Sequence, residues 1–369
     1  MTEWKTCTLS DLGEIVGGAT PSTKDETNYG GDIAWITPKD LSTLKGRFIT
    51  HGERNITEKG LNSCSTQMMP TNAVLFSSRA PIGYVAIAAN PVCTNQGFKS
   101  IIANADNDPM FLYYLLKYNK NAIEAMGSGT TFKEVSGSTM RSIRVRVPVS
   151  KAEQQRIASV LDALDSKIEN NDKINDNLQQ QAQAIYASMF IDNADPEWEQ
   201  GHLSDLITVK YGKDHKKLAD GSYPVYGSGG VMRYVERPLY DKESVLIPRK
   251  GTLNNVMYVN QPFWSVDTMF YTEMRLPNVA KFVYHFVKAK DLASMNAGSA
   301  VPSMTTDILN AMEVAIPSAS ALEEFEALVS PMYKAMQEND NQSETLAKLR
   351  DALLPKLMSG EIDISGIQL

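Results

Sequence analysis

The residue types that most often perform catalysis or bind metals are few and scattered in this sequence of 369 residues. The four histidines are His51, His202, His215 and His285. None of them has the spacing to another histidine or to a cysteine that a metal site needs. The three cysteines are Cys7, Cys64 and Cys93. Their odd number and uneven spacing argue against a disulfide framework or a zinc site, so we interpret them as buried or incidental thiols.

The sequence also lacks the short motifs that position phosphates, metals or nucleophiles. It contains no phosphate loop ending in Gly-Lys-Ser or Gly-Lys-Thr, no dinucleotide-binding Gly-x-Gly-x-x-Gly, no His-Glu-x-x-His, no paired Cys-x-x-Cys and no Gly-x-Ser-x-Gly elbow. The run YGSGG at 226–230 is more typical of a turn than of a phosphate cradle, because glycine permits positive φ. A catalytic carboxylate pair stays open as an alternative. The missing motifs favour a binding protein over an enzyme.

Hydropathy gives no sign of a membrane or secreted protein. No apolar run is long enough to span a bilayer, and the first residues, MTEWKTCTLSDL, lack the basic and then apolar layout of a signal peptide. We therefore expect a cytoplasmic protein. Its length allows two or three domains, each with its own core.

The beginning of the chain recurs in its second half. WKTCTLSDL starts at Trp4 and WEQGHLSDL starts at Trp198, with the tryptophan and the Leu-Ser-Asp-Leu tetrad in the same register. Four residues can recur by chance, so this similarity needs further support before it indicates an internal duplication.

That support comes from two heptad patterns. Residues at alternating steps of four and three form a first seam: Ile157, Leu161, Leu164, Ile168, Asn171, Asn175, Leu178, Ala182, Ile185 and Met189. The same steps form a second seam: Phe325, Val329, Met332, Met336, Asn339, Ser343, Leu346, Arg350, Leu353 and Leu357. Both seams become polar at their fifth and sixth positions, which are Asn171 and Asn175 in the first and Asn339 and Ser343 in the second. The shared register and its polar break indicate a true internal duplication.

Each seam predicts a helix of about 40 residues, or about 60 Å at 1.5 Å per residue. Such a helix cannot bury its apolar stripe on itself, so we predict that the two helices pair as an antiparallel coiled coil with their apolar seam residues in the interface. Separate surface helices are the alternative. Pro355 interrupts the second seam and should kink or end the helix nearby, and SGEI at 359–362 marks its exit.

The segments before the two helices contain short β-prone runs and one helical run each, which predicts an α+β fold for both. We divide the chain into a first globular domain at 1–150, a first long helix at 151–195, a second globular domain at 196–318, and a second long helix with its tail at 319–369. The net charge is −7. The acidic residues are concentrated in the helical segments, so the globular segments could still bind nucleic acid.

The two globular segments align without close identity. We align VLFSSRAPIG with VLIPRKGTLN so that Arg79 corresponds to Arg249. Each segment also has a Gly/Ser-bearing loop, MGSGTTF or NAGSAVPSM, before a strand that ends at Pro148 or Pro317. Similar scaffolds with different loops are what two binders of different targets would have.

These features together resemble the specificity subunits of type I restriction-modification systems over nearly the whole chain. The first domain has GGATPSTKDETNYGGDIAWITPKDL, ITEKGLNSCSTQMMPTNAVLFSSRAPIGYVAI and TNQGFKSI, and the second has YPVYGSGG, LIPRKG and FWSVDTMFY. The helix entry with Glu-Gln between Pro148 and Ile157 and the closing LLPKLMSGEI complete the resemblance. The second helix entry lacks the Glu-Gln pair.

The resemblance implies a subunit that is not catalytic and binds no cofactor. Two target-recognition domains would each recognise one half of an asymmetric, two-part site in double-stranded DNA, and the helices would set the spacer. Two methyltransferase subunits, which use S-adenosylmethionine to methylate adenine, would be partners. Two motor-nuclease subunits, which use ATP and magnesium, would be optional further partners.

If the resemblance holds, Lys, Arg, hydroxyl and amide side chains on loops are the candidates for phosphate and base contacts. In the first domain we expect Lys39, Arg79, Asn95, Gln96, Lys99, Ser128, Thr130, Thr131 and Lys133. In the second we expect Lys213, Lys216, Lys217, Tyr226, Ser228, Arg233, Arg249, Lys250 and Asn254. KDHKK at 213–217 is the best phosphate candidate. A solvated surface charge or a turn residue is the alternative for each position.

Two other hypotheses remain at this stage. The chain could be a coiled-coil scaffold whose two domains bind proteins or carbohydrates, which predicts no salt-dependent affinity for DNA. It could also be an enzyme with an unrecognised carboxylate site, which predicts activity of the chain alone.

Overall fold

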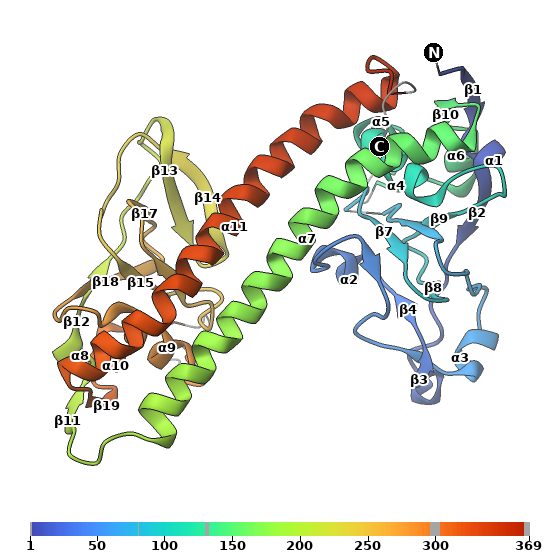
Figure 1. Ribbon diagram of the computed structural model, residues 1–369. Coiled ribbons are helices and arrows are strands. Elements are labelled where there is room, and N and C mark those ends of the chain that lie inside the picture. Colours follow the sequence, from blue (N-terminus) through green and yellow to red (C-terminus); the bar gives the residue numbers. More distant parts are fainter. Residues whose placement is uncertain (1, 80, 130–132, 296–302, 365–369) are drawn as a thin grey trace. The chain divides into compact units, whose positions relative to one another are not determined.

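The computed structural model describes residues 2–79, 81–129, 133–295 and 303–364, and it divides the chain into two compact units (Figure 1). Unit 1 comprises Met1–Lys173 and Asn339–Leu369, and unit 2 comprises Ile174–Glu338. Each long helix contributes one part to unit 1 and the other part to unit 2. The architecture is α+β with two long helices, as the sequence predicts.

Unit 1 is built on a five-stranded sheet in the order β2-β9-β6-β7-β5. Its strands are β2 (Gly13–Gly17), β5 (Phe48–Ile49), β6 (Val74–Phe76), β7 (Val85–Ala88) and β9 (Lys99–Ala103). Successive side chains of a strand face opposite ways. Val74 and Phe76 therefore pack with helix α4 (Pro109–Tyr118), while Leu75 packs into a second apolar cluster.

The remaining elements of unit 1 surround this sheet. They are β1 (Trp4–Thr8), α1 (Leu9–Leu12), η1 (Glu26–Asn28), β3 (Tyr29–Ile33), β4 (Trp35–Ile36), α2 (Pro38–Ser42), α3 (Glu58–Asn62), β8 (Cys93–Thr94), α5 (Lys120–Ala125), α6 (Gly137–Ser142) and β10 (Arg144–Pro148). Strands β4 and β8 pair in parallel, and β1 pairs antiparallel with β10.

Unit 2 repeats the plan with two smaller sheets, in the orders β12-β18-β15-β16 and β14-β13-β17. The strands are β12 (Ile207–Tyr211), β13 (Asp220–Gly227), β14 (Gly230–Val235), β15 (Ser244–Pro248), β16 (Met257–Val259), β17 (Trp264–Ser265) and β18 (Met269–Met274). Val245 and Ile247 pack with helix α9 (Ala280–Lys288), whereas Leu246 faces a separate cluster. Strands β11 (Glu199–His202) and β19 (Glu313–Ile316) and helices α8 (Leu203–Leu206) and α10 (Thr306–Asn310) complete the unit.

The recurrent Leu-Ser-Asp-Leu tetrad forms the same short helix in both units. Its aspartate accepts a hydrogen bond of 2.7 Å from the backbone N–H at the helix start, with Asp11 bonded to Thr8 and Asp205 bonded to His202. The preceding strand pairs antiparallel with the strand before the long helix, as β1 with β10 and β11 with β19. The repeated sequence is thus a repeated structure.

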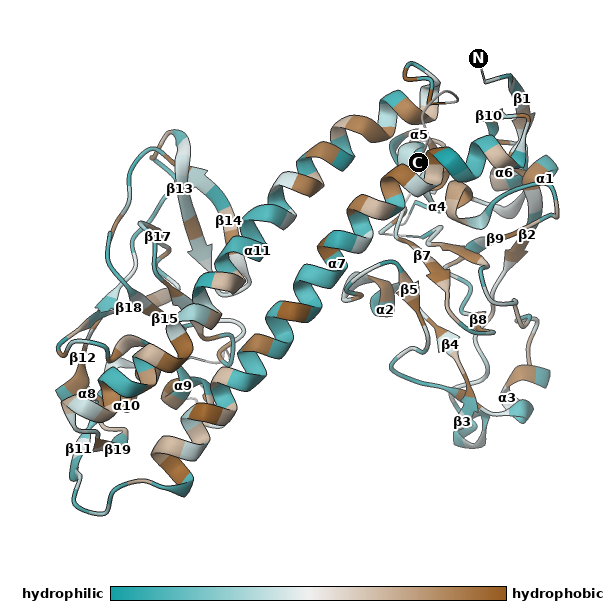
Figure 2. Cartoon of the chain, viewed as in Figure 1, coloured by the Kyte–Doolittle hydropathy of each residue, from teal (hydrophilic) through white to brown (hydrophobic). Residues whose placement is uncertain are grey.

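The two long helices are α7 (Lys151–Ala187), which continues as the π-helix η2 (Ser188–Asp192), and α11 (Ala319–Ser359). In unit 1, Ile157 and Leu161 share an apolar cluster with Leu357, and in unit 2, Ala182 shares one with Phe325 and Val329. Residues early in α7 thus cluster with residues late in α11, and residues late in α7 cluster with residues early in α11. The pairing is therefore antiparallel. Figure 2 shows hydrophobic residues recurring along both helices.

The predicted pairing residues differ in burial along the helices. Ile157, Leu161, Val329 and Leu357 are buried. Ile185, Met332, Met336 and Leu353 are half-buried against the apolar clusters. Leu164, Ile168, Leu178 and Leu346 are half-buried near the middle of the helices.

Polar residues meet near the middle of the seam. In unit 1 the Nδ2 of Asn171 donates to the carbonyl of Asn339 at 3.3 Å, to Gln342 Oε1 at 3.0 Å and to Ser343 Oγ at 3.1 Å. In unit 2 the Nδ2 of Asn175 donates to the carbonyl of Met336 at 3.3 Å. Such contacts favour one register because a shift would leave the buried amide without partners.

Helix α11 continues through Pro355 and ends soon after it, at Ser359. The helix therefore ends near the proline, as predicted, but not at it. The turn beyond the helix is made by Gly360, whose φ is +77°. Glycine adopts this left-handed backbone without the steric cost of a Cβ, which explains why the helix ends there. None of the helices in the described ranges is long and apolar enough to cross a membrane.

Candidate nucleic-acid interface

Three loops of unit 1 that carry predicted DNA-binding residues are joined by backbone hydrogen bonds. The N–H of Ser78 donates to the carbonyl of Gly97 at 2.7 Å, and the N–H of Val135 donates to the carbonyl of Ser78 at 2.9 Å. The N–H of Asn95 donates to the carbonyl of Ile36 at 3.0 Å. The loops after β4, β6 and β8 and the segment before α6 therefore form one edge of the unit.

The basic side chains on this edge converge on one carboxylate. Arg79 Nε lies 3.0 Å from Glu134 Oε2, and Lys99 Nζ lies 3.6 Å from Glu134 Oε1. Ser128 pairs with the backbone of Glu134, and Lys133 beside it is exposed. The carboxylate offsets part of the positive charge of this edge and holds Arg79 and Lys99 in place.

The other predicted residues of unit 1 take part in local contacts. Asn95 Oδ1 accepts from the N–H of Gly97 at 2.8 Å, and Gln96 Oε1 accepts from Thr20. Lys39 is exposed and forms an ion pair of 2.6 Å with Glu53. Thr130 and Thr131 lie outside the described residues.

Unit 2 builds the equivalent edge with the same backbone hydrogen bonds. The N–H of Arg249 donates to the carbonyl of Thr268 at 2.9 Å, and the N–H of Met304 donates to the carbonyl of Arg249 at 2.9 Å. Arg249 thus occupies the place of Ser78, and Lys250 occupies that of Arg79. The match of Arg79 with Arg249 was wrong by one residue, because the backbone hydrogen bonds pair Arg79 with Lys250, as the two ten-residue runs do when they are read without a gap.

The equivalence extends to the carboxylate of unit 1. Arg79 forms a β-bridge with Glu134, and Lys250 forms one with Ser303, so unit 2 has a serine in place of the glutamate. The Arg249 guanidinium lies 5.4 Å from the centroid of the Tyr211 ring, and Lys250 is exposed. The edge of unit 2 therefore has one more cation and one less carboxylate than that of unit 1 at these positions.

The basic run at 213–217 lies beside the same edge. Lys213, Lys216 and Lys217 are exposed, and the N–H of Lys213 donates to the carbonyl of Ser265 at 2.8 Å. Asp214 Oδ1 accepts from the N–H of Lys216 at 3.0 Å, and this backbone hydrogen bond lowers the pKa of the Asp214 carboxyl. The turn directs three lysines to solvent.

Four other predicted residues of unit 2 have partners within the unit. Asn254 donates to Asp291 at 3.0 Å and accepts from the N–H of Ala293 at 2.9 Å, so both ends of its amide hold a turn. Arg233 donates to Asp220 at 2.6 Å. Tyr226 and Ser228 are half-buried, with the Tyr226 hydroxyl accepting from Gln261 at 3.3 Å. These contacts supply a structural role for each residue, and their contact with DNA stays a prediction.

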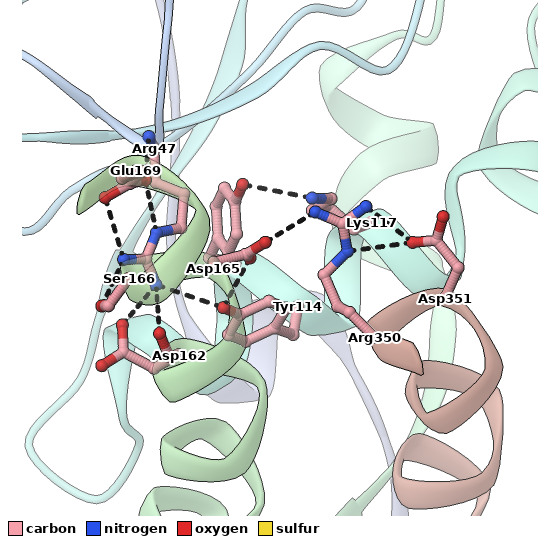
Figure 3. A network of polar contacts seen from close by, with 10 residues as sticks. Arg47, Tyr114, Lys117, Asp162, Asp165, Ser166, Glu169, Arg350 and Asp351 are labelled. Carbon is pink, nitrogen blue, oxygen red and sulfur yellow. Dashed lines mark hydrogen bonds and ion pairs between the residues drawn. The ribbon is translucent and has the colours of Figure 1, made fainter. Parts of the chain in front are cut away.

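A buried network that the sequence did not predict fastens the globular part of unit 1 to α7 (Figure 3). Arg47, 4% exposed, precedes β5, and its guanidinium donates to Glu169 at 2.9 Å and 3.1 Å and to Ser166 at 2.8 Å. It also forms an ion pair with Asp162. Burial by itself would lower the pKa of Arg47, but its interactions with Glu169 and Tyr114 hold that pKa above its ordinary value.

The network continues to α11 through α4. Arg47 donates to the Tyr114 hydroxyl at 3.2 Å, and this hydroxyl donates to Asp165 at 2.8 Å. Asp165 also accepts from Arg350 of α11 at 2.6 Å. Burial raises the pKa of Tyr114, so the hydroxyl keeps its proton and can donate. One connected set of polar groups thus joins α4, α7 and α11 in unit 1.

Unit 2 has a different network at its helices. Lys281 of α9 is buried and donates to Glu326 of α11 at 2.6 Å and to Glu243 at 3.1 Å. His285, which is fully buried, lies between Gln183 of α7 at 2.7 Å and the Tyr333 hydroxyl of α11 at 2.9 Å. Burial lowers the pKa of His285 to about 3, so its imidazole is neutral near pH 7.

Neither network resembles a catalytic or metal site. Among the described residues, no group of histidines, cysteines and carboxylates could hold a metal ion. The networks instead pair the buried cations of Arg47 and Lys281 with carboxylates, which is a structural use of charge.

Comparisons with known proteins agree with this architecture. The family model of the type I restriction modification DNA specificity domain matches residues 1–180 and again residues 196–344. The chain is 32% identical to the type I restriction enzyme MjaIX specificity subunit of Methanocaldococcus jannaschii, over 99% of this chain and 95% of that protein. It is 24% identical to the EcoprrI specificity subunit of Escherichia coli, over 87% of each chain.

Among solved structures, the crystal structure of a type I restriction-modification S subunit from M. genitalium has the same fold, with a TM-score of 0.63. It covers 97% of this chain and 96% of its own, at 19% sequence identity. The fold is therefore that of two repeated DNA specificity domains with long helices. This chain belongs to the family of type I restriction-modification specificity subunits, which are the non-catalytic, DNA-recognising components of their complexes.

Proposed function

We propose that each unit of this subunit recognises one half of a two-part site in double-stranded DNA through its loop edge. We name the globular part of unit 1, before α7, recognition domain 1, and that of unit 2, between the two long helices, recognition domain 2. The observation that supports the proposal is the shared backbone frame with different side chains: Ser78 and Arg79 in domain 1 correspond to Arg249 and Lys250 in domain 2. A conserved frame with changed side chains suits two domains that recognise different bases.

The predicted contacts divide into two kinds. Flexible, exposed lysines such as Lys213, Lys216 and Lys217 suit phosphate, which carries no sequence information. Arg79 and Arg249 are held in place by neighbours, and a held guanidinium suits the paired acceptors of guanine. We propose the first group as positioning contacts and the second as base contacts.

The long helices would set the length of the unrecognised spacer. Two domains linked rigidly bind one DNA molecule far more tightly than either domain alone, but only when both can engage together. Lengthening α7 and α11 by one heptad each at matching positions should lengthen the spacer and leave both half-sites unchanged.

The chemistry would reside in partner subunits. We propose that two methyltransferase subunits with S-adenosylmethionine bind this subunit and methylate adenine, and that two motor-nuclease subunits with ATP and magnesium are optional further partners. The complex would act on chromosomal DNA in the cytoplasm.

Co-expression with the methyltransferase subunit of the same system, followed by sequencing of the host DNA for methylated adenine, tests the proposal. One split motif that depends on this chain is the expected result. A complex that forms but methylates no new motif would contradict it. A salt series then decides between DNA and a protein or carbohydrate target, because DNA affinity must fall steeply as salt rises.

A further inference from the structure

We propose that Arg47 is a positioning residue that fixes the angle of recognition domain 1 on its helices and so restricts methylation to one spacer length. This inference rests on the proposed function above. Helix length would set the distance between half-sites, whereas the Arg47 joint would set how domain 1 is rotated. We use "Arg47 joint" for Arg47 with Asp162, Ser166 and Glu169.

The joint spans successive turns of one helix. The guanidinium contacts Asp162, Ser166 and Glu169, which lie on one face of α7 because they are separated by four and three residues. The backbone N–H of Arg47 also donates to Glu169 at 3.0 Å. Both the main chain and the side chain of the same residue are therefore bound to the helix, which restricts rotation as well as separation.

The approach of the loop to the helix is close. Gly46, with a φ of +87°, precedes Arg47, and a Cβ built on it would lie 3.1 Å from Glu169 Oε1. A larger residue there would meet both backbone strain and the carboxylate. Gly46 therefore allows the loop to lie close to α7, next to the contacts of Arg47 with Glu169.

The joint connects to the edge that would contact DNA. The carbonyl of Arg47 accepts from the N–H of Ile87 at 2.8 Å, and β5 then pairs in parallel with β7. Strand β7 also pairs with β6, and the turn between them carries Arg79. A short path of main-chain hydrogen bonds thus runs from α7 through Arg47 to the recognition loop.

The described residues of unit 2 form no such joint at the corresponding helix position. The seam registers make Gln337 of α11 the counterpart of Glu169, and its Oε1 accepts a hydrogen bond from Asn260 at 3.3 Å. This neutral amide pair is exposed, whereas the guanidinium of Arg47 is buried. The angular constraint at this helix position is therefore specific to recognition domain 1.

DNA geometry makes such a constraint selective. One added base pair rotates the second half-site by roughly 35° about the DNA axis, since a turn holds 10–10.5 base pairs. It also moves that half-site by about 3.4 Å. A domain held by several hydrogen bonds cannot follow this rotation, whereas a domain released from α7 can.

The test uses the complete methyltransferase complex with wild-type chain or with Arg47→Met, which keeps an unbranched, flexible side chain and removes the guanidinium with its charge. Plasmids carry the wild-type half-sites with spacers from two base pairs shorter to two longer. We expect wild type to methylate one spacer. We expect Arg47→Met to raise methylation of the neighbouring spacers, relative to the original one, at least tenfold, with the same half-site bases.

Arg156→Met is the matched control, because Arg156 is an exposed arginine of α7, the helix that Arg47 contacts, and it is paired with Glu153. It should keep wild-type spacer selectivity. If Arg47→Met does not assemble, Glu169→Gln replaces it, because this variant keeps a hydrogen-bond acceptor for Arg47. It should also raise methylation of the neighbouring spacers, by a smaller factor than Arg47→Met. Unchanged spacer selectivity in the assembled variant would overturn the inference. Failure of the proposed function is distinct, because wild type would then methylate no split motif.

Discussion

In unit 1 the globular domain is joined to its helices by Arg47, which comes from a loop and contacts three residues of α7. In unit 2 the corresponding connection is made by Lys281, which comes from α9 and contacts Glu326 of α11. The two connections use different elements, different helices and different cations. Duplication has therefore preserved the seam and the backbone frame, while the residues that fasten each domain have diverged.

The comparison is closest on α4 and α9, where YYLLK at 113–117 corresponds to YHFVK at 284–288. In both, the lysine lies over the ring of the first tyrosine, at 5.2 Å for Lys117 and 4.9 Å for Lys288. Burial lowers the pKa of both lysines. The second position differs, with Tyr114 in unit 1 and His285 in unit 2. Only the histidine has an ordinary pKa near neutrality, and burial lowers that pKa to about 3 in the fold.

The largest expected effect is on the free energy of unfolding, through the apolar core that each unit has around its long helices. Phe325 of unit 2 occupies the seam position of Ile157 in unit 1, and both are buried. Phe325→Ala should lower the free energy of unfolding by about 3–5 kcal/mol and Ile157→Ala by about 2–5 kcal/mol, because each leaves a cavity. Denaturant titrations measure both. A loss below 1 kcal/mol for either would contradict its place in a packed core.

Breaking the two joints should have local and separate effects. Arg47→Met and Lys281→Met should each lower the free energy of unfolding by up to about 3 kcal/mol, because partly buried carboxylates lose their cation, and the partial exposure of Asp162 and Glu243 moderates the loss. Hydrogen exchange should speed up in β5 and β7 for the first variant and in α9 for the second. Equal acceleration in both units for one variant would contradict independent joints.

Changes at the recognition edges should alter DNA binding rather than stability. Arg249→Ala should weaken binding of the cognate site by about 1–3 kcal/mol and relax base preference in one half-site. Arg275→Ala is the control, because Arg275 is an exposed arginine of unit 2 just after β18, where it donates to Thr208 at 3.1 Å, and it was not predicted to contact DNA. Titrations with cognate and altered half-sites measure the difference. Equal losses for the two variants would show that general positive charge, rather than the edge, determines binding.

The effect that is smallest near neutral pH is the protonation of His285. The pKa of His285 is near 3 in the fold and near 6.5 when unfolded, so the unfolded chain binds more protons between these values. Stability of unit 2 should thus be full above pH 6.5 and fall by up to about 1.4 kcal/mol per pH unit below it. Hydrogen exchange in α9 should report this loss, and α4 should not. His285→Phe should remove the dependence, and its persistence would contradict this assignment.

The features predictable from the sequence are those set by periodicity. The seam residues, the polar level at Asn171 and the repeated Leu-Ser-Asp-Leu helix follow from spacing alone, and the structure has them. These features repeat along one element, so each residue predicts the next. The family and its non-catalytic class were also predictable, because ordered motifs covered nearly the whole chain.

Contacts between distant segments were not predictable from spacing. Spacing did not single out Arg47, although Asp162, Ser166 and Glu169 form a polar stripe on α7 that a cation could neutralise. The register of Arg249 was misjudged because like residue types were matched, whereas the ungapped runs place Arg79 opposite Lys250. The turn that Asn254 holds was not predictable, because an exposed loop amide looks the same in sequence whether it holds a turn or faces solvent, and its contact with DNA stays a prediction.

The central claim is that two similar domains each recognise their own half of one site. The most direct measurement is adenine-methylation sequencing of hosts that carry the methyltransferase complex with wild-type chain or with the double variant Arg249→Ala and Lys250→Ala. The account predicts one split motif for wild type and loss of base preference in only one half for the variant. Relaxation of both halves, or a motif without two parts, would contradict it.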